Sequence, residues 1–215
     1  MVRMPAQDYT SKRERIKTSA TALFADKGFY GTSIIDIANA CNTVKSRLYY
    51  YFPSKGQLFY EIIKDHAEFL IETLLPILQS RELDARSRLE RYAKELLGMN
   101  VKYREQHKLI LNELGALSPE QSREINFLLR RTIEALYPTL IEINPKLRGN
   151  EHLYFPTAMM FVGMINWTHT WYNRPKNEDE NESEEQDEDG LSVDAFAQLL
   201  CDTFLDGYSA RETSA

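Results

Sequence analysis

The sequence lacks any long uninterrupted run of apolar residues, and its 215 residues include only two cysteines and four histidines. A membrane-spanning helix needs about 20 predominantly apolar residues, so we expect no transmembrane segment and no membrane partner. No apolar signal core follows the N-terminus, which predicts a cytoplasmic protein. Cys41 and Cys201 lie far apart and match no metal-binding spacing; we predict that Cys41 is a small buried hydrophobe.

The histidines are scattered along the chain and accompany no nucleophile or metal-binding motif. We therefore predict no catalytic residue, no metal site, no cofactor and no enzyme activity. These four histidines are His66, His107, His152 and His169.

Charge is distributed unevenly along the chain. The formal net charge is −6, an unexpected sign for a protein that binds nucleic acid. Residues 1–60 carry nine Lys or Arg against four Asp or Glu, which gives +5, and the remainder carries 17 against 28, which gives −11. A basic first quarter on an acidic remainder is typical of a DNA-binding head attached to a body that does not touch DNA.

An acidic run occupies residues 176–190, with nine Asp or Glu in 178–189. Such a block repels itself and has no apolar surface to bury, so we predict a disordered loop. It lacks the glycine position and ligand spacing of a calcium loop. A weaker hypothesis is that it keeps the body away from DNA by repulsion.

Residues 32–58 have the pattern of a helix-turn-helix. Ser33 with Asp36 three residues later predicts a capped short helix. Asn42 suits a tight left-handed turn, and a second helix is expected over 45–51. It must end before Pro53, because the residue that precedes a proline is pushed away from helical geometry.

The second helix has more polar and aromatic residues than a core can bury. We expect Leu48 to face inward, together with Tyr51 or Phe52. Basic side chains pair with phosphates or guanine edges, and hydroxyls bond phosphate oxygens. Lys55 opens the next helix, where its charge opposes the helix dipole, and a bound phosphate would offset that conflict. The alternative is an aromatic helix packed in a bundle with solvated charges.

This stretch resembles the DNA-binding domain of the TetR family of bacterial repressors, whose motif ends in Leu-Tyr-x-Tyr-Phe-x-Ser-Lys-x-x-Leu. The matching residues are Leu23, Phe24, Gly28, Thr32, Ile37, Ala38, Leu48, Tyr49, Tyr51, Phe52, Ser54, Lys55 and Leu58. The chain departs from the usual pattern at Asn42, Val44 and Ser46. These departures bear on the backbone contacts and the operator sequence rather than on the fold.

The resemblance implies an all-α protein with a helix-turn-helix head, residues 1–54, and a ligand-binding and dimerisation body, residues 55–215. The DNA-binding residues that we predict are Thr32, Ser33, Thr43, Lys45, Ser46, Arg47, Tyr49, Tyr50 and Lys55. Additional phosphate contacts are predicted on the first helix, residues 11–27, foremost from Lys12 and Arg13; a solvated basic end is the alternative.

The body pattern predicts further helices over 55–79, in two segments within 84–116, from Ser118 onward, over 151–173 and over 192–209. We expect the helix 55–79 to be the single link between head and body. The last two helices, given twice by a symmetric pair, would form a four-helix homodimer interface. The predicted interface residues are Trp167, Trp171, Phe196, Leu200 and Phe204.

A small-molecule inducer is what the family resemblance implies for the body. The predicted ligand-binding residues are Met99, Tyr103, Phe127, Arg131, Met159 and Asn166; for each of them an ordinary core or solvated position is the alternative. The segment Asn166-Trp167-Thr168-x-Thr170-Trp171-Tyr172 resembles TetR-type regulators of acyl-CoA catabolism, which implies an acyl-CoA thioester as the inducer.

The sequence thus predicts a regulator, most simply a repressor, that is released from a palindromic double-stranded operator by a ligand. The rival function is a helical protein-interaction module that does not read DNA. Three alternatives stay open: an activator, a regulator that responds to another hydrophobic ligand, and a regulator that responds to no ligand. The operator sequence, the regulated genes and oligomers beyond a dimer are not readable from the sequence.

Overall fold

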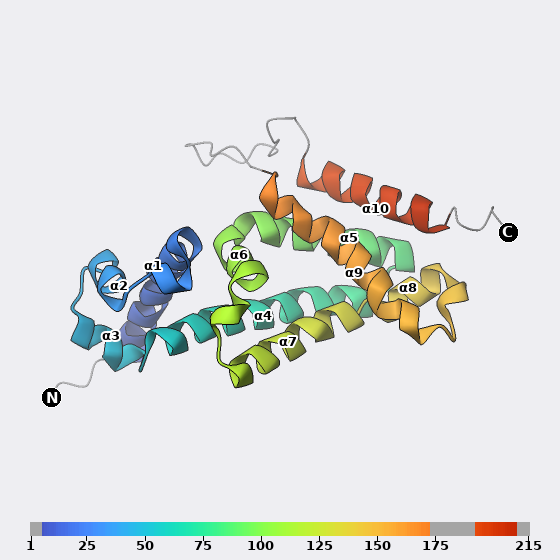
Figure 1. Ribbon diagram of the computed structural model, residues 1–215. Helices are drawn as coiled ribbons and strands as arrows, with labels where there is room; N and C mark the ends of the chain where they lie inside the picture. Colours follow the sequence, from blue (N-terminus) through green and yellow to red (C-terminus); the bar gives the residue numbers. More distant parts are fainter. Residues whose placement is uncertain (1–5, 173–191, 210–215) are drawn as a thin grey trace. The chain divides into compact units, whose positions relative to one another are not determined.

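The computed structural model describes residues 6–172 and 192–209, and within these ranges every regular element is helical (Figure 1). The predicted all-α fold is confirmed. The helices are α1 (Ala6–Gly31), α2 (Ile34–Ala40), α3 (Lys45–Tyr51), α4 (Lys55–Gln79), α5 (Ala85–Lys102), α6 (Arg104–Asn112), α7 (Pro119–Glu134), α8 (Tyr137–Ile143), α9 (Tyr154–Asn166) and α10 (Val193–Ser209). Short 3-10 turns are η1 (Leu114–Ala116), η2 (Pro145–Leu147), η3 (Glu151–Leu153) and η4 (Trp167–Thr170). The acidic run 176–190 lies outside the described residues.

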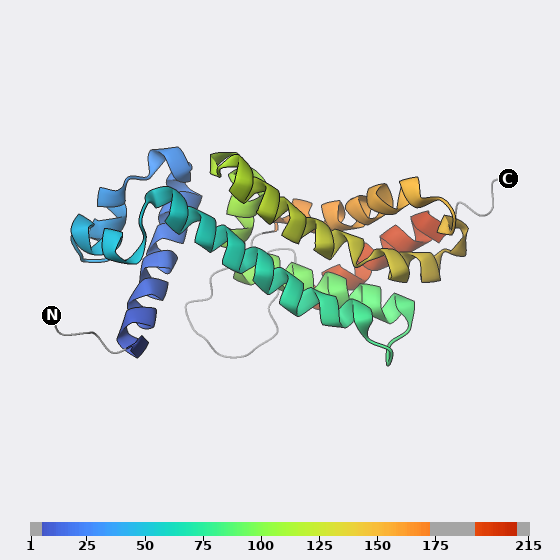
Figure 2. The same cartoon turned by 90° about the horizontal axis from the view of Figure 1, so that it is seen from below.

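The chain packs as two compact units, and each is interleaved in sequence with the other. The first unit is Met1–Glu68 with Glu105–Phe127, and the second is Phe69–Arg104 with Leu128–Ala215. The chain therefore passes between the units inside α4, at the α5–α6 junction and inside α7. The first unit thus combines the predicted head, residues 1–54, with residues 55–68 and 105–127 of the predicted body. In both units, half of α4 lies beside half of α7 (Figure 2).

In the first unit, α1 is longer than the sequence pattern predicts. It starts at Ala6, five residues before the predicted cap Ser11, and it is interrupted at Gly28, where φ is 72°. Glycine has no Cβ, so it enters this left-handed region without the steric cost that other residues meet. The chain direction thus changes at Gly28.

Aromatic rings form the core of the first unit around the end of α1. The ring of Phe24 lies 5.1 Å from that of Phe59 and 5.8 Å from that of Phe29, centroid to centroid. Phe29 thus packs on the core, whereas the next residue, Tyr30, is 80% exposed.

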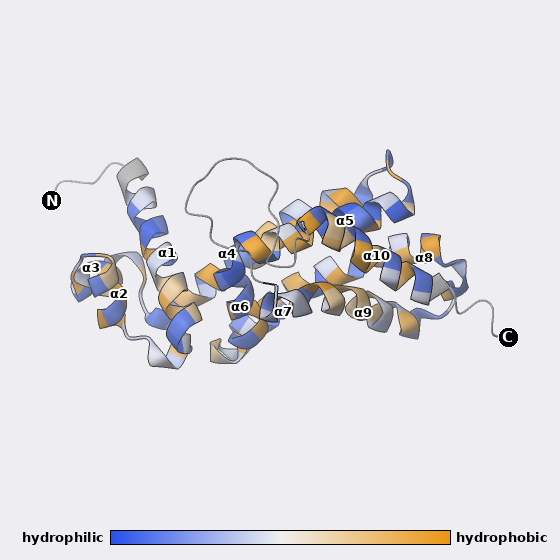
Figure 3. Cartoon of the chain, turned by 90° about the horizontal axis from the view of Figure 1, so that it is seen from above, coloured by the Kyte–Doolittle hydropathy of each residue, from blue (hydrophilic) through white to orange (hydrophobic). Residues whose placement is uncertain are grey.

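In the second unit, α5 is the central helix, and α8, α9 and α10 pack around it (Figure 1). Tyr92 of α5 approaches Phe161 of α9, whose ring lies 4.9 Å from that of Phe204 on α10. Burial raises the pKa of the Tyr92 phenol, which stays neutral in this core. Orange and blue residues alternate along α4, α5 and α10 in Figure 3, as expected of amphipathic helices.

Several predicted boundaries are confirmed and one is wrong. The Ser118–Gln121 capping box starts α7, and Ser192 caps α10. The predicted helix 151–173 is divided into η3, α9 and η4. Within the described ranges no helix is long and apolar enough to cross a lipid bilayer.

His66, buried in the first unit near His107, predicts a pH-dependent stability. Burial lowers the pKa of His66 from 6.5 to about 4. The unfolded chain therefore binds one more proton than the folded chain between these two pKa values, so the free energy of unfolding falls as the pH is lowered through this window. We expect a loss of about 1 kcal/mol per pH unit, measured by urea unfolding.

His66→Gln should flatten this dependence between pH 6.5 and pH 4. His152→Gln, at an exposed histidine, is the matched control and should keep the wild-type slope. Equal slopes in wild type and His66→Gln would contradict the assignment.

Candidate nucleic-acid interface

The helix-turn-helix forms from the local signals that the sequence predicts. The Ser33 amide donates to Asp36 Oδ2 at 2.8 Å, and the Asp36 amide donates to Ser33 Oγ at 3.1 Å, which completes the capping box of α2. Asn42 occupies the left-handed region with φ 50° and makes the turn into α3. These contacts fix the direction of α3 relative to α2.

The α3 helix has one buried side and one exposed, polar side. Leu48 and Tyr51 are buried, and the outward residues are Lys45, Ser46, Arg47, Tyr49 and Tyr50. Neither Lys45 nor Arg47 forms an ion pair within the described residues. Two unpaired cations, three hydroxyls and no acid on one face make a surface suited to phosphate oxygens and base edges.

The residues that flank α3 differ in exposure. Ser33 is exposed and Thr43 is half-buried, so both are accessible to some degree. Thr32 is only 1% exposed, and its Oγ1 donates to Gly28 O at 2.9 Å and to Leu23 O at 3.1 Å. Thr32 was predicted to bind DNA, and this is wrong for its side chain because the hydroxyl is buried and already bonded.

Lys55 has internal partners for its charge. Its Nζ donates to Phe29 O and to Thr32 O, at 2.8 Å each, and lies 4.2 Å from the centroid of the Phe29 ring. The conflict with the helix dipole is therefore offset by two carbonyls at the α1–α2 junction. These contacts give Lys55 a role in positioning the helices around α3, and its contact with DNA stays a prediction.

The basic residues of α1 are also partly engaged. Arg13 pairs with Glu61 and lies 4.7 Å from the centroid of the Phe52 ring, while Lys17 pairs with Asp65 at 2.5 Å. Arg15 is exposed and has no ion pair in the described part of the chain. Arg15 is therefore better placed than the predicted Arg13 to meet a phosphate.

Sequence reasoning missed Tyr9, which belongs to the first turns of α1. Its ring centroid lies 4.9 Å from that of Tyr51 and 5.8 Å from that of Tyr50. Aromatic pairs at this separation prefer defined relative orientations, so Tyr9 supports one of the exposed rings of α3. Tyr9 precedes Ser11, where the predicted first helix begins, so the helical pattern did not include it.

The six predicted ligand-binding residues are not brought together. Phe127 is 63% exposed in the first unit, and Met159 is 41% exposed on the outer side of α9, so these two assignments are wrong. Met99 is buried in α5, and Tyr103 packs on Phe69. The remaining two residues are Asn166, which has a buried oxygen, and Arg131, which lines a cavity.

Polar atoms are buried along α5 and at the end of α9. The Asn166 Oδ1 is buried without a hydrogen-bond partner in the described residues, and so are both amide atoms of Asn100. Arg131 lines a cavity in the second unit. Arg131 is thus the predicted ligand residue that lines this cavity.

The predicted dimer residues divide into two groups. Trp167 and Trp171 are 66% and 51% exposed, and Phe196 packs on Trp171 with ring centroids 5.4 Å apart. Leu200 and Phe204 are buried instead, because α10 turns them toward α5 and α9 of the same chain. Their assignment to the interface is wrong.

Comparison with known proteins agrees with these helices. Residues 16–62 match the family model of bacterial regulatory proteins of the tetR family, and residues 82–176 match that of a tetracyclin repressor-like C-terminal domain. The HTH-type transcriptional repressor KstR2 of Mycolicibacterium smegmatis is 32% identical over 70 residues, which are 33% of this chain and 34% of that protein. The match therefore spans about a third of that relative's length.

Solved structures match over nearly the whole chain. A TetR-family transcriptional regulator from Bordetella parapertussis 12822 is 34% identical, with a TM-score of 0.79 over 92% of this chain and 96% of that one. AibR, solved in complex with isovaleryl coenzyme A and operator DNA, shares the fold at 20% identity, with a TM-score of 0.68 over 91% and 97% of the two chains. The family consists of transcriptional regulators, which are not enzymes. With both family models matched and a relative aligned along its full length, this chain belongs to the TetR family of bacterial transcriptional regulators, and its α2–α3 pair is the helix-turn-helix of a DNA-binding regulator.

Proposed function

We propose that this chain is a homodimeric repressor that binds a palindromic operator through α3 and is released from it by a small molecule. The observation that carries the proposal is the outward face of α3, where two cations and three hydroxyls have no acidic partner. Such a surface is suited to the negative charge of DNA, and no ion pair must be broken to use it.

In the DNA complex, α3 would lie in the major groove. Arg47 and Lys45 would reach guanine edges or phosphates, and the hydroxyls of Ser46, Tyr49 and Tyr50 would bond phosphate oxygens. Two heads of a dimer would contact successive major grooves about 34–36 Å apart, which requires a two-fold operator. Such a repressor would act in the bacterial cytoplasm, where the chromosomal DNA lies.

Dimerisation would use the exposed apolar side of α9 and its neighbour α10. The large apolar side chains exposed there are Phe155, Met159, Met160, Met164, Trp167, Trp171 and Leu199. A monomer rarely leaves so many large apolar residues uncovered on neighbouring segments, here α9, η4 and α10, and Trp and Met are enriched at interfaces. We propose Leu199 in place of Leu200 and Phe204.

The release step would follow from ligand binding in the residues 55–215 that we assign to the body. A ligand shifts the DNA-binding equilibrium only by its different affinity for the two conformations. The structure of AibR with isovaleryl coenzyme A and operator DNA supports an acyl-CoA thioester as a candidate.

The function is tested by anisotropy titrations against DNA selected from a random duplex library, at two salt concentrations. We expect enrichment of an inverted repeat, and an affinity that falls steeply with salt. Acyl-CoA thioesters are then added to the complex. Failure to enrich any sequence at either salt concentration would favour the protein-interaction module over the repressor.

The outward face of α3 predicts a loss of affinity without a loss of stability. Arg47→Ala should weaken operator binding about tenfold or more and reduce the salt dependence, because each such contact contributes about 1–3 kcal/mol. Arg123→Ala, an exposed arginine on α7, is the matched control and should bind like wild type. Unchanged affinity in Arg47→Ala would remove α3 from the interface.

For Lys55 we expect the opposite pattern, a loss of stability without a change in salt dependence. Lys55→Met removes two charged hydrogen bonds and should lower the free energy of unfolding by about 2 kcal/mol, measured by urea denaturation. Operator affinity should fall as the junction loosens, without the reduced salt dependence of Arg47→Ala. If the Lys55→Met protein has wild-type stability but its operator binding depends less on salt, Lys55 contacts a DNA phosphate instead.

The exposed apolar residues of α9 and of the segment that follows it predict a homodimer. Trp167→Ser combined with Trp171→Ser should raise the dimer dissociation constant about tenfold or more, measured by sedimentation. Tyr30→Ser, at an exposed aromatic of the first unit, is the control. A double variant that dimerises as wild type does would place the interface elsewhere.

A further inference from the structure

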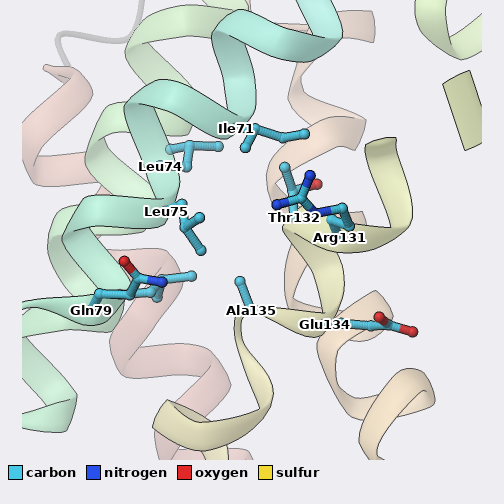
Figure 4. A pocket seen from close by; sticks show the side chains of 9 residues that line it. Ile71, Leu74, Leu75, Gln79, Arg131, Thr132, Glu134 and Ala135 are labelled. Atoms are coloured by element: carbon cyan, nitrogen blue, oxygen red, sulfur yellow. The ribbon is translucent and has the colours of Figure 1, made fainter. Parts of the chain in front are cut away.

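A cavity of about 310 Å³ lies in the second unit, between the C-terminal half of α4 and the C-terminal half of α7 (Figure 4). The α4 side is formed by Ile71, Leu74, Leu75, Leu78 and Gln79, and the α7 side by Arg131, Thr132, Glu134 and Ala135. One wall is thus almost entirely aliphatic, and the other is polar.

Charge on the polar wall is not balanced. Glu134 Oε1 accepts a hydrogen bond from Arg130 Nε at 2.6 Å, so its charge is compensated from outside the lining. Arg131 has no ion pair among the described residues. In Figure 4, Arg131 and Thr132 lie across the cavity from the side chains of α4. The uncompensated charge at the cavity is therefore the single positive charge of Arg131.

The aliphatic wall supplies the second requirement of a ligand. Leu74 and Leu78 are buried at its base, while Ile71 and Leu75 are half-buried and border the open space. An apolar group that covers them is removed from water together with the leucines, which favours binding. A guanidinium offers a planar fork of donors that fits a carboxylate or phosphate in a bidentate manner.

We propose that this cavity binds a small anionic amphiphile, with its acidic group on Arg131 and its apolar chain against the leucines of α4. Ligand pockets in proteins span about 300–1,000 Å³, so this one fits a compact occupant, such as a medium-chain carboxylate. The same chemistry is available from a free acid or from the acyl end and phosphates of a coenzyme A thioester. The inference rests on the proposed ligand-responsive repressor, and it names the ligand class and its site.

The test is calorimetric titration of the full chain, without DNA, with four probes of equal chain length: octanoate, octanoyl-CoA, octan-1-ol and octylammonium. We expect octanoate or octanoyl-CoA to bind at least tenfold more tightly than the alcohol or the cation. Preference for octanoate identifies the free acid as the source, and preference for octanoyl-CoA identifies the thioester. Equal binding of the neutral or cationic probe, or no binding of either anion at millimolar concentration, overturns the proposal.

Variants then locate the site. Arg131→Gln should lower the affinity for the preferred anion about tenfold, which is the usual effect of losing a hydrogen bond to a charged group. Arg123→Gln lies on the same helix but outside the lining and should bind as wild type does. Ala135→Met fills the cavity with a larger side chain and should also weaken binding of the anion. It serves as the second test if the Arg131→Gln protein does not fold. Wild-type affinity in Ala135→Met, or in a folded Arg131→Gln, overturns the proposed site.

Operator binding by the wild-type chain is measured separately, with the DNA that library selection yields. Loss of ligand binding with specific operator binding intact overturns only the cavity proposal. Absence of operator binding overturns the repressor, whatever the calorimetry shows.

Discussion

The first unit depends on one buried set of contacts at the start of α4. The Lys55 ammonium joins the carbonyls of Phe29 and Thr32 and lies over the Phe29 ring. It thereby connects the end of α1, the short segment between α1 and α2, and the first turn of α4. The Thr32 hydroxyl reinforces the same junction through Leu23 and Gly28. Because α3 is bounded by α2 and α4, this junction sets the direction in which the polar face of α3 points. The internal contacts of the half-buried Lys55 can therefore affect DNA binding.

The second unit separates two tasks on the faces of its helices. On α9, Phe161 and Ile165 fill the core with α5, whereas Met159, Met160 and Met164 remain exposed. On α10, Leu200 and Phe204 belong to the core, and Leu199 points outward. A helix that is apolar on most sides packs once within its own chain and still offers a surface to a second copy. Both the fold and the proposed dimer thus draw on the same short segments.

The proposed ligand cavity lies on helices that the two packing units share. In α4 the residues up to 68, and in α7 the residues up to 127, belong to the first unit. The residues that line the cavity follow in the second unit. Tyr60 and Lys64 of α4 both bond Glu124 of α7 in the first unit. An occupant that changes the spacing of α4 and α7 at Leu75 and Arg131 would act on the same helix pair that meets again at Lys64 and Glu124. Under the proposed function, coupling between ligand and DNA would use these two helices.

The sequence by itself determined the local structure of the head and the family. Ser33, Asp36, Asn42 and Pro53 act through capping, left-handed backbone and proline sterics, which depend on near neighbours, so α2, its turn and α3 were predictable. Only the tertiary structure decided what depends on distant partners. It turned Lys55 and Arg13 toward the interior, buried Thr32, Leu200 and Phe204, exposed Phe127 and Met159, and placed Arg131 opposite Leu75. Periodicity identifies which side of a helix is apolar, but it does not distinguish a core from an interface or a cavity, because all three bury the same side chains.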